Sequence, residues 1–517
     1  MNQIGKQQVP RNLLMNIISF TVNTGTGLWL VPYLIGHLGT AVYGLVPLAM
    51  VFTQFVSVIT QSFNVATGRF LTLNIQGKDH DGAVSVFNGS LLVVVAFVVI
   101  QALISFVMLI NLEALIQIPG GFYRDTLWLF GLTFTGFLFS LISSVFSISM
   151  YSHNRVDLMR INDIVRILAR VTTIVILFFS FGPGLVHIGV ANLVGGLSVL
   201  FLSIRYWRIL TPELKIRPRT ADLKQFRSMF GMATWILVNQ VGYLLFLRID
   251  TYVINRFIGP ESCGEYAAVQ QWNQLIRTTA GVLSGAISPL AIIYYARGEI
   301  EKLIRMLKLA VKLMGFAIAA PVALLCVFSG DILAFWLGED FRRLGSLLTL
   351  QLAPLVINLA VLPLFSINTA FNRVKIPAIL TCLLGGLNLF LAVIFATQTT
   401  LGYYGVAVAG VFVLTLKNLL FTPLYAAHIL DLPKKTFLRP VFTGAVAFLL
   451  VLACGTAVGE GLQLRNLFEV GLTISVACLG AGLIIAWMGL SNDERGILAD
   501  LVPGSARRFA QKVLLVK

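Results

Sequence analysis

The chain has 517 residues, of which 57% are hydrophobic and 12% are charged. This balance is typical of a polytopic membrane protein and excludes a soluble enzyme with a large core. The formal net charge of +16 is also found in nucleic-acid-binding proteins, but here the lysines and arginines fall in short loops at alternate ends of apolar segments, as membrane topology requires, so we expect no nucleic-acid partner.

Fourteen apolar segments are long enough to cross a bilayer as helices, which takes about 20 residues each. The first follows Lys6 and Arg11 without a signal-peptidase-like site, so we expect it to remain as an uncleaved span. The expected spans are residues 12–35, 43–69, 83–110, 125–151, 160–181, 185–207, 228–256, 264–294, 309–329, 345–370, 376–397, 402–427, 437–458 and 467–489. The predicted fold is therefore an all-α polytopic membrane protein with about 14 transmembrane helices.

Loops rich in lysine and arginine alternate with poor loops along the chain. The poor loops contain only Arg124, Arg256, Arg342, Arg343 and Arg465. Because cytoplasmic loops carry the excess of Lys and Arg, this alternation predicts a multi-pass protein of the cell (inner) membrane with both termini in the cytoplasm.

An internal repeat divides the chain into two halves. The segment Phe146–Val156 recurs as Phe365–Val374 at an offset of 219 with one residue deleted, each time at the cytoplasmic end of a span. Six spans per copy is an even number, so the two copies share one orientation in the membrane. We predict two parallel six-helix lobes at residues 1–209 and 228–430, a cytoplasmic linker at 210–227, and two further helices with a cytoplasmic tail at 431–517.

Two charged residues, Arg248 and Asp250, lie deep in the apolar run of residues 229–258. A charged side chain at that depth costs a few kcal/mol or more unless it faces a protein interior or a wet cavity. Residues two apart on a helix point about 200° apart, so these two do not simply neutralise each other. At least one needs another partner, and a substrate is one candidate.

Three further cations are expected at or near membrane depth: Arg69, Arg277 and Lys417. A guanidinium fork suits a phosphate better than an ammonium does, which favours the arginines as ligands of an anionic headgroup. These cations and Arg248 also have alternative roles. Arg69 is alternatively a charge that marks the inner boundary of the membrane, and Lys417 a residue that snorkels to the inner surface. For Arg248 and Arg277 the alternative is a buried ion pair with Asp250.

A second set of polar residues lies in the first two spans. Asn23 belongs to the first, while Gln54, Gln61 and Asn64 fall with Ser57 on one face of the second. Their amides suit sugar hydroxyls, and they suit helix-to-helix packing equally well.

Short motifs give the chain a resemblance to a known family. They are Tyr33-x5-Gly39-x3-Tyr43-Gly44, Arg248-x-Asp250 followed by Gly259 and Gly264-x-Tyr266, Trp336-Leu-Gly338 with Phe341, and Phe371-Asn-Arg373 with Lys375 and Pro377. Over residues 10–430 the chain resembles the polysaccharide and O-antigen (Wzx-like) branch of the multidrug/oligosaccharidyl-lipid/polysaccharide (MOP) flippase superfamily. The lobes are then expected to be MATE-like.

The resemblance implies alternating-access transport of a polyprenyl-diphosphate-linked oligosaccharide from the inner to the outer leaflet. It implies membrane lipids as surroundings, a polymerase or glycosyltransferase as candidate partners, and headgroup binding by Arg248, Arg277, Lys417 and Arg69. An ion-coupled drug or cation antiporter on the same fold is the alternative. That activity needs acids at cavity depth, and the second span ends without one.

Asp250 is the only acid well inside an expected span, and it is our candidate for proton or sodium coupling; orienting Arg248 or Arg277 is its alternative role. No Walker motif is present, and we expect no cofactor. The five cysteines have no paired spacing and the five histidines no cluster, so we expect no metal site. Short outer loops without paired acids argue against an enzyme such as a glycosyltransferase or polymerase.

Overall fold

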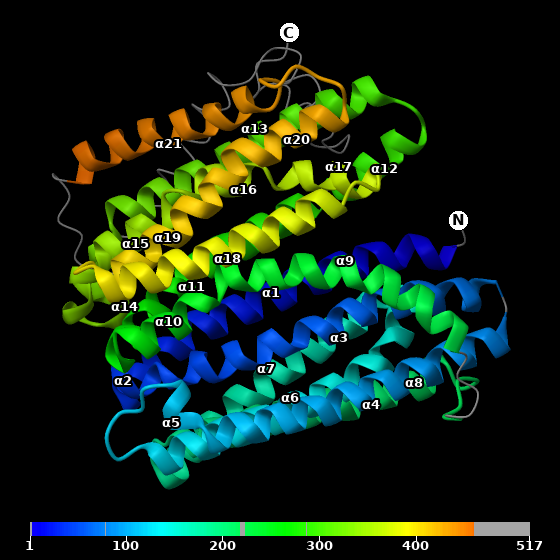
Figure 1. Ribbon diagram of the computed structural model, residues 1–517, viewed down its shortest axis with the longest axis horizontal. Helices are drawn as coiled ribbons and strands as arrows, with labels where there is room; N and C mark the ends of the chain where they lie inside the picture. Colours follow the sequence, from blue (N-terminus) through cyan, green and yellow to red (C-terminus); the bar gives the residue numbers. More distant parts are fainter. Residues whose placement is uncertain (1–2, 78, 218–222, 286, 460–517) are drawn as a thin grey trace. The chain divides into compact units, whose positions relative to one another are not determined.

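The computed structural model describes residues 3–77, 79–217, 223–285 and 287–459 (Figure 1). Every regular element in these ranges is a helix, which confirms the all-α prediction. Helices are required because the hydrocarbon core offers no water to the backbone, and a helix satisfies its own amides and carbonyls.

Contacts divide the chain into two compact units. The first contains Met1–Ala268 and Ala378–Val406; the second contains Val269–Pro377 and the chain from Ala407 onwards. The first unit thus includes helices from both halves of the sequence. The lobes expected at 1–209 and 228–430 stay a prediction.

The first unit is a bundle of long helices with a few short ones. Its helices are α1 (Gln3–Leu38), α2 (Thr40–Tyr43), α3 (Leu45–Gln76), α4 (His80–Ile110), α5 (Leu112–Leu115), α6 (Tyr123–Ser152), α7 (Val156–Phe181), α8 (Leu185–Leu210), α9 (Leu223–Leu247), α10 (Ile249–Phe257), the start of α11 (Pro260–Gly285) and most of α18 (Lys375–Gln398). Within this unit α8 packs along α6 and α7, and α1 packs along α7 (Figure 1).

Small residues set a close helix contact in the first unit. A Cβ atom built at Gly136 of α6 would lie 2.6 Å from the backbone oxygen of Asn192 and 2.8 Å from Cα of Leu193, both on α8. The two backbones approach this closely only because Gly136 has no side chain, as is common where membrane helices pack.

The second unit contains more broken helices. Besides the rest of α11 it has α12 (Ser288–Ala296), α13 (Ile300–Val327), α14 (Ser329–Leu337), the 3₁₀ helix η2 (Glu339–Leu344), α15 (Gly345–Leu352), α16 (Leu355–Ala360), the 3₁₀ helix η3 (Leu362–Leu364), α17 (Phe365–Ala370), α19 (Tyr403–Leu416), the π-helix η4 (Lys417–Phe421), α20 (Thr422–Ile429) and α21 (Leu438–Gly459). The most extensive helix-to-helix contact of this unit is between α13 and α21, where Gly315 meets Gly444.

Eleven segments of the described chain are long and apolar enough to cross a membrane. Two shorter apolar stretches, Thr40–Gln54 and Leu237–Leu247, lie in the helices expected as the second and seventh spans. The fourteenth expected span, residues 467–489, lies outside the described residues. The structure therefore supports a multi-pass protein, while the count of fourteen is not confirmed.

Several expected spans are not continuous helices, and two of them show how a span is interrupted. Residues 228–256 form α9 and α10, which meet at Arg248. Residues 345–370 form α15, α16, η3 and α17, with Pro354 before α16 and Pro363 inside η3. A proline lacks the N–H that a continuing helix needs, which explains the interruptions in the second case.

Both copies of the repeated segment end their helix in the same way. Asn154 and Asn372 have left-handed backbones, with φ of 56° and 53°. The amide of the next residue then returns to a helix carbonyl, from Arg155 to Met150 and from Arg373 to Asn368, each at 2.8 Å. Asparagine tolerates this conformation better than most residues, so the repeated Asn-Arg pair marks a shared turn.

Candidate functional site

Arg248 lies at the break between α9 and α10. Its backbone, with φ of −130° and ψ of −23°, interrupts the helix, and Ile249 begins the next one. The side chain is half-buried. The angle of about 200° expected for a continuous helix therefore does not apply to Arg248 and Asp250. The break instead places a cation where the helix direction changes, in the middle of an apolar run.

Asp250 is buried in the first turn of α10. Its Oδ2 accepts a hydrogen bond of 2.9 Å from the Tyr266 hydroxyl of α11. Nearby, the Cys263 thiol donates to the carbonyl of Thr251 at 3.5 Å. The carboxylate thus connects two helices of the first unit. Its role in ion coupling stays a prediction.

Arg277 belongs to the second unit and is held by a relay of side chains. Its Nε donates to Oδ1 of Asn273, one turn earlier on α11, at 2.6 Å. Asn273 in turn donates from Nδ2 to the carbonyl of Gln351 on α15 at 3.1 Å. Trp272 packs edge-on against Trp336 of α14 with 5.5 Å between ring centroids. The half-buried guanidinium is therefore fixed in direction near the middle of the candidate span Pro260–Ala296.

Lys417 opens the π-helix between α19 and α20. Its ammonium lies 5.8 Å from the ring centroid of Phe365, within cation–π range. The next residue, Asn418, is buried and donates to Oδ1 of Asn358 at 3.2 Å. Asn358 also donates to the Thr415 hydroxyl at 3.1 Å. Single-turn π-helices occur frequently at functional sites, and this one presents a cation beside a buried polar cluster.

The polar residues proposed for sugar binding fall into separate environments. Asn23 is exposed on α1, and Gln54 is half-buried on α3. Asn64 donates to the Ser144 hydroxyl of α6 at 2.8 Å, which is a helix-to-helix contact. The side chains of Gln61 and Arg69 lie outside the described residues. Their roles stay predictions.

A charged face of α7 was missed by the sequence analysis. Arg160, Asp163, Arg166 and Arg170 recur every three or four residues inside the span Val156–Phe181. Arg160 lies 3.0 Å and Arg166 3.6 Å from the Asp163 carboxylate. Asp250 is therefore not the only acid inside a spanning helix. The three-to-four spacing of the charges was the signal available in the sequence.

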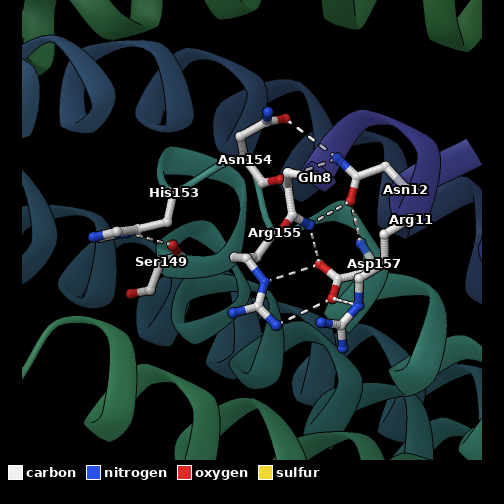
Figure 2. A network of polar contacts seen from close by, with 8 residues as sticks. All are labelled: Gln8, Arg11, Asn12, Ser149, His153, Asn154, Arg155 and Asp157. Carbon is white, nitrogen blue, oxygen red and sulfur yellow. Dashed lines mark hydrogen bonds and ion pairs between the residues drawn. The ribbon is translucent and has the colours of Figure 1, made fainter. Parts of the chain in front are cut away.

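The N-terminal part of α1 is tied to the turn between α6 and α7 by a buried acid (Figure 2). The Asp157 carboxylate, 0% exposed, accepts a bidentate pair from Arg155 at 3.0 and 3.1 Å. It also pairs with Arg11 at 3.0 Å and accepts from Gln8 at 2.8 Å. The hydrogen bonds that Arg155 donates to Asp157 raise the pKa of the Arg155 guanidinium above its ordinary value. The network is a structural clamp, since all of its charges are satisfied within it.

No group of three or more His, Cys, Asp or Glu side chains in the described residues is arranged to hold a metal ion. The candidate site is therefore built from cations and amides. Arginine forks in such an environment bind carboxylates and phosphates, because they cannot be deprotonated and offer paired donors.

Comparison with known proteins places this architecture. The family model described as polysaccharide biosynthesis protein matches residues 9–292. The uncharacterized membrane protein EpsK of Bacillus subtilis (strain 168) is 31% identical over 437 residues, which are 83% of this chain and 85% of that protein.

Two groups of solved structures share the fold. The lipid II flippase MurJ, in an inward closed conformation, aligns with a TM-score of 0.64 at 15% identity, over 92% of this chain and 98% of that chain. An inward-facing multidrug resistance MATE family transporter of the MOP superfamily aligns with a TM-score of 0.60 at 16% identity, over 86% and 96%. The MATE-like fold expected from the sequence motifs is therefore confirmed.

Proposed function

Because the chain belongs to the polysaccharide biosynthesis protein family, we propose that it carries a polyprenyl-diphosphate-linked oligosaccharide from the inner to the outer leaflet by alternating access. The fold is shared with transporters and a lipid II flippase, which supports a transporter in place of an enzyme. A diphosphate and its sugars cannot cross hydrocarbon unaided, since every polar group would lose its water.

The observation that carries the proposal is the fixed guanidinium of Arg277 at membrane depth. Its relay through Asn273 to the backbone of Gln351 removes the freedom that an arginine normally loses on binding. A cation prepared in this way suits an anionic headgroup. Arg248, at the break between two helices, is proposed as a second headgroup ligand, with Lys417 and Arg69 in supporting roles.

The driving force follows from the charge of the cargo. Moving an anionic headgroup outward follows an inside-negative membrane potential, worth about 2.3 kcal/mol per charge for each 100 mV. We propose Asp250 as the group that couples a proton or sodium gradient to transport, with the Tyr266 hydroxyl as its partner in this conformation.

The remaining assignments rest on the same proposal. We propose that the protein lies in the inner membrane with both termini in the cytoplasm and has two lobes at 1–209 and 228–430. In this proposal the side-chain amides of Asn23, Gln54, Gln61 and Asn64 face sugar hydroxyls. A polymerase or glycosyltransferase is the proposed class of protein partner, since the oligosaccharide must be built before and used after transport.

The test is a deletion strain complemented with variants. Deletion should cause a lipid-linked oligosaccharide to accumulate on the cytoplasmic side, measured by mass spectrometry of extracted lipids. The wild-type gene should clear it. Arg277→Ala and Arg248→Ala should fail to restore surface glycan although the protein is inserted. Arg277→Lys should restore it only in part, because it keeps the charge and loses the fork.

The matched control is Arg297→Ala, which removes an exposed cation from the second unit. It should restore glycan delivery fully. Full delivery by both Arg277→Ala and Arg248→Ala would refute the headgroup role. A deletion strain with normal glycan but altered tolerance to cationic drugs would instead favour the antiporter alternative.

A further inference from the structure

The geometry points to a second phosphate-binding subsite, formed by Arg166 and Arg170 on α7, that takes the diphosphate headgroup of the lipid-linked substrate. This inference rests on the function proposed above and adds residues of the first unit to it. Arg277, by contrast, belongs to the second unit.

The two arginines lie deep in a spanning helix. Arg170 is about 14 residues from the start of α7 at Val156, or roughly 21 Å at 1.5 Å per residue. Arg166 is one turn closer to the start, at about 15 Å. A cation at such depth needs water, a protein partner or a ligand.

The arginines do not point to the lipid side of α7. Leu168, Val175 and Phe179 form an exposed apolar stripe, with Phe179 92% exposed. Arg170 is two residues from Leu168, which places it about 160° around the helix from that stripe. The Arg166 side chain is nevertheless 50% exposed. An exposed arginine opposite the lipid-facing stripe indicates a space open to water or to a polar ligand.

Among the described residues, these two cations have few acidic partners. Asp163 is shared between Arg160 and Arg166, so one carboxylate faces two guanidinium groups. Arg170 forms no ion pair with any described residue, and its buried Nε has no hydrogen-bond acceptor among them. A buried donor left in this state is unfavourable, and a bound phosphate oxygen would accept a hydrogen bond from it.

Neighbouring helices support the arginines from behind. Gly195 of α8 faces their stems: a Cβ atom built there would lie 3.5 Å from Cγ of Arg166 and 3.8 Å from Cβ of Arg170. With no side chain at Gly195, α8 lies close to these stems. Since Arg166 and Arg170 are four residues apart on one face, each can take one phosphate of a diphosphate.

The test is equilibrium binding to the purified full-length protein in detergent, with three probes: farnesyl diphosphate, farnesyl monophosphate and inorganic diphosphate. Wild-type protein should bind farnesyl diphosphate most tightly. Arg170→Gln and Arg166→Gln should each weaken that binding at least tenfold, and Arg170→Lys should fall between Gln and wild type. Arg208→Gln, an exposed arginine in the last turn of α8, is the matched control and should bind as wild type does.

Thermal unfolding separates binding from folding. Because Arg170 has no carboxylate partner among the described residues, Arg170→Gln should melt at or above the wild-type temperature in the absence of ligand. A lower melting temperature for this variant, or wild-type binding by it, would overturn the inference. Equal or tighter binding of inorganic diphosphate would overturn the assignment to a lipid headgroup.

The two proposals fail in distinguishable ways. Normal farnesyl diphosphate binding by both α7 variants removes the subsite and leaves transport, which is tested by lipid accumulation in the deletion strain. Absence of that accumulation, with binding still dependent on Arg170, removes the transport assignment and leaves a diphosphate-binding site.

Discussion

At the scale of single residues, buried charges fall into two groups according to whether the protein neutralises them. Asp157 belongs to the first group, since Arg155, Arg11 and Gln8 surround its carboxylate. Arg170 belongs to the second, because no described residue accepts from its Nε. A buried charge with partners in the fold indicates a role in stability, and a buried charge without such partners indicates a role in ligand binding.

Substitution of the first kind of charge should affect folding. Asp157→Asn leaves two arginines without their carboxylate at a fully buried position, so we expect a loss of about 3 kcal/mol in unfolding free energy. Arg11→Gln should cost at most about 1 kcal/mol, since the Arg11 side chain is 57% exposed and its pair is screened by water.

Thermal unfolding of the detergent-purified protein measures both effects. The control is Asp81→Asn, which removes an exposed acid from the first turn of α4. Equal melting temperatures for Asp157→Asn and Asp81→Asn would mean that the clamp at the start of α7 contributes nothing to stability.

At the scale of helices, the sequence predicts where a helix lies better than it predicts whether that helix is continuous. Apolar length located α4, α6 and α8 within a few residues of their observed bounds. It did not reveal the break at Arg248, where neither glycine nor proline marks the change of direction, or the π-helix that begins at Lys417. Both depend on tertiary contacts that no local pattern encodes.

The start of α7 shows the same limit. Its span was expected from residue 160, with Arg155 in the preceding loop. The helix begins at Val156, and the Asp157 carboxylate in its first turn is neutralised in part by Arg11 of α1, which is far away in sequence. The sequence holds no local sign of that pairing.

The contact between α6 and α8 gives a helix-scale prediction. Gly136→Ala should reduce the yield and melting temperature of the protein, because its new methyl group would meet the α8 backbone at Asn192 and the helices would have to separate. Overpacking of this kind costs about 1–3 kcal/mol.

Gly131→Ala is the matched control on the same helix. The nearest atom to a Cβ built there is a leucine methyl 3.8 Å away, which is ordinary contact. Fluorescence-detected size-exclusion chromatography after a heating series compares the two variants. Indistinguishable profiles would show that the close approach at Gly136 is not needed for packing.

At the scale of the whole molecule, the family and the MATE-like fold were accessible from short motifs, while the cation set was only partly accessible. Arg248 and Arg277 were selected because they interrupt strongly apolar runs. Arg166 and Arg170 lie inside the span expected at residues 160–181, but they were not selected as candidates. Charged residues of a transporter are therefore found more completely by asking which of them share one helix face than by looking for charges that interrupt an apolar run.

The coupling of an ion gradient to transport is a property of the whole molecule, and the Asp250→Asn variant tests it. Asp250→Asn keeps the hydrogen bond from Tyr266 but removes the titratable carboxylate. If Asp250 couples an ion gradient to transport, this variant should transport at a rate that no longer responds to collapse of the proton or sodium gradient. The measurement is glycan delivery in cells treated with an ionophore selective for each ion.

The control for coupling is Tyr266→Phe, which keeps the carboxylate and removes its hydroxyl partner. It should keep gradient dependence. An Asp250→Asn protein with unchanged dependence on both gradients would exclude Asp250 from coupling and leave it a role in joining α10 to α11.

The left-handed asparagines at 154 and 372 have a consequence for how such proteins diverge. A β-branched residue at either position strains the backbone by about 1–2 kcal/mol, whatever glycan is carried. The charge three residues later is not set by the turn, since Asp157 and Lys375 occupy equivalent places with opposite charge. Each bend permits little beyond asparagine, aspartate or glycine, while the charge that follows it is decided by its own contacts, such as those of Asp157 with Arg155 and Arg11.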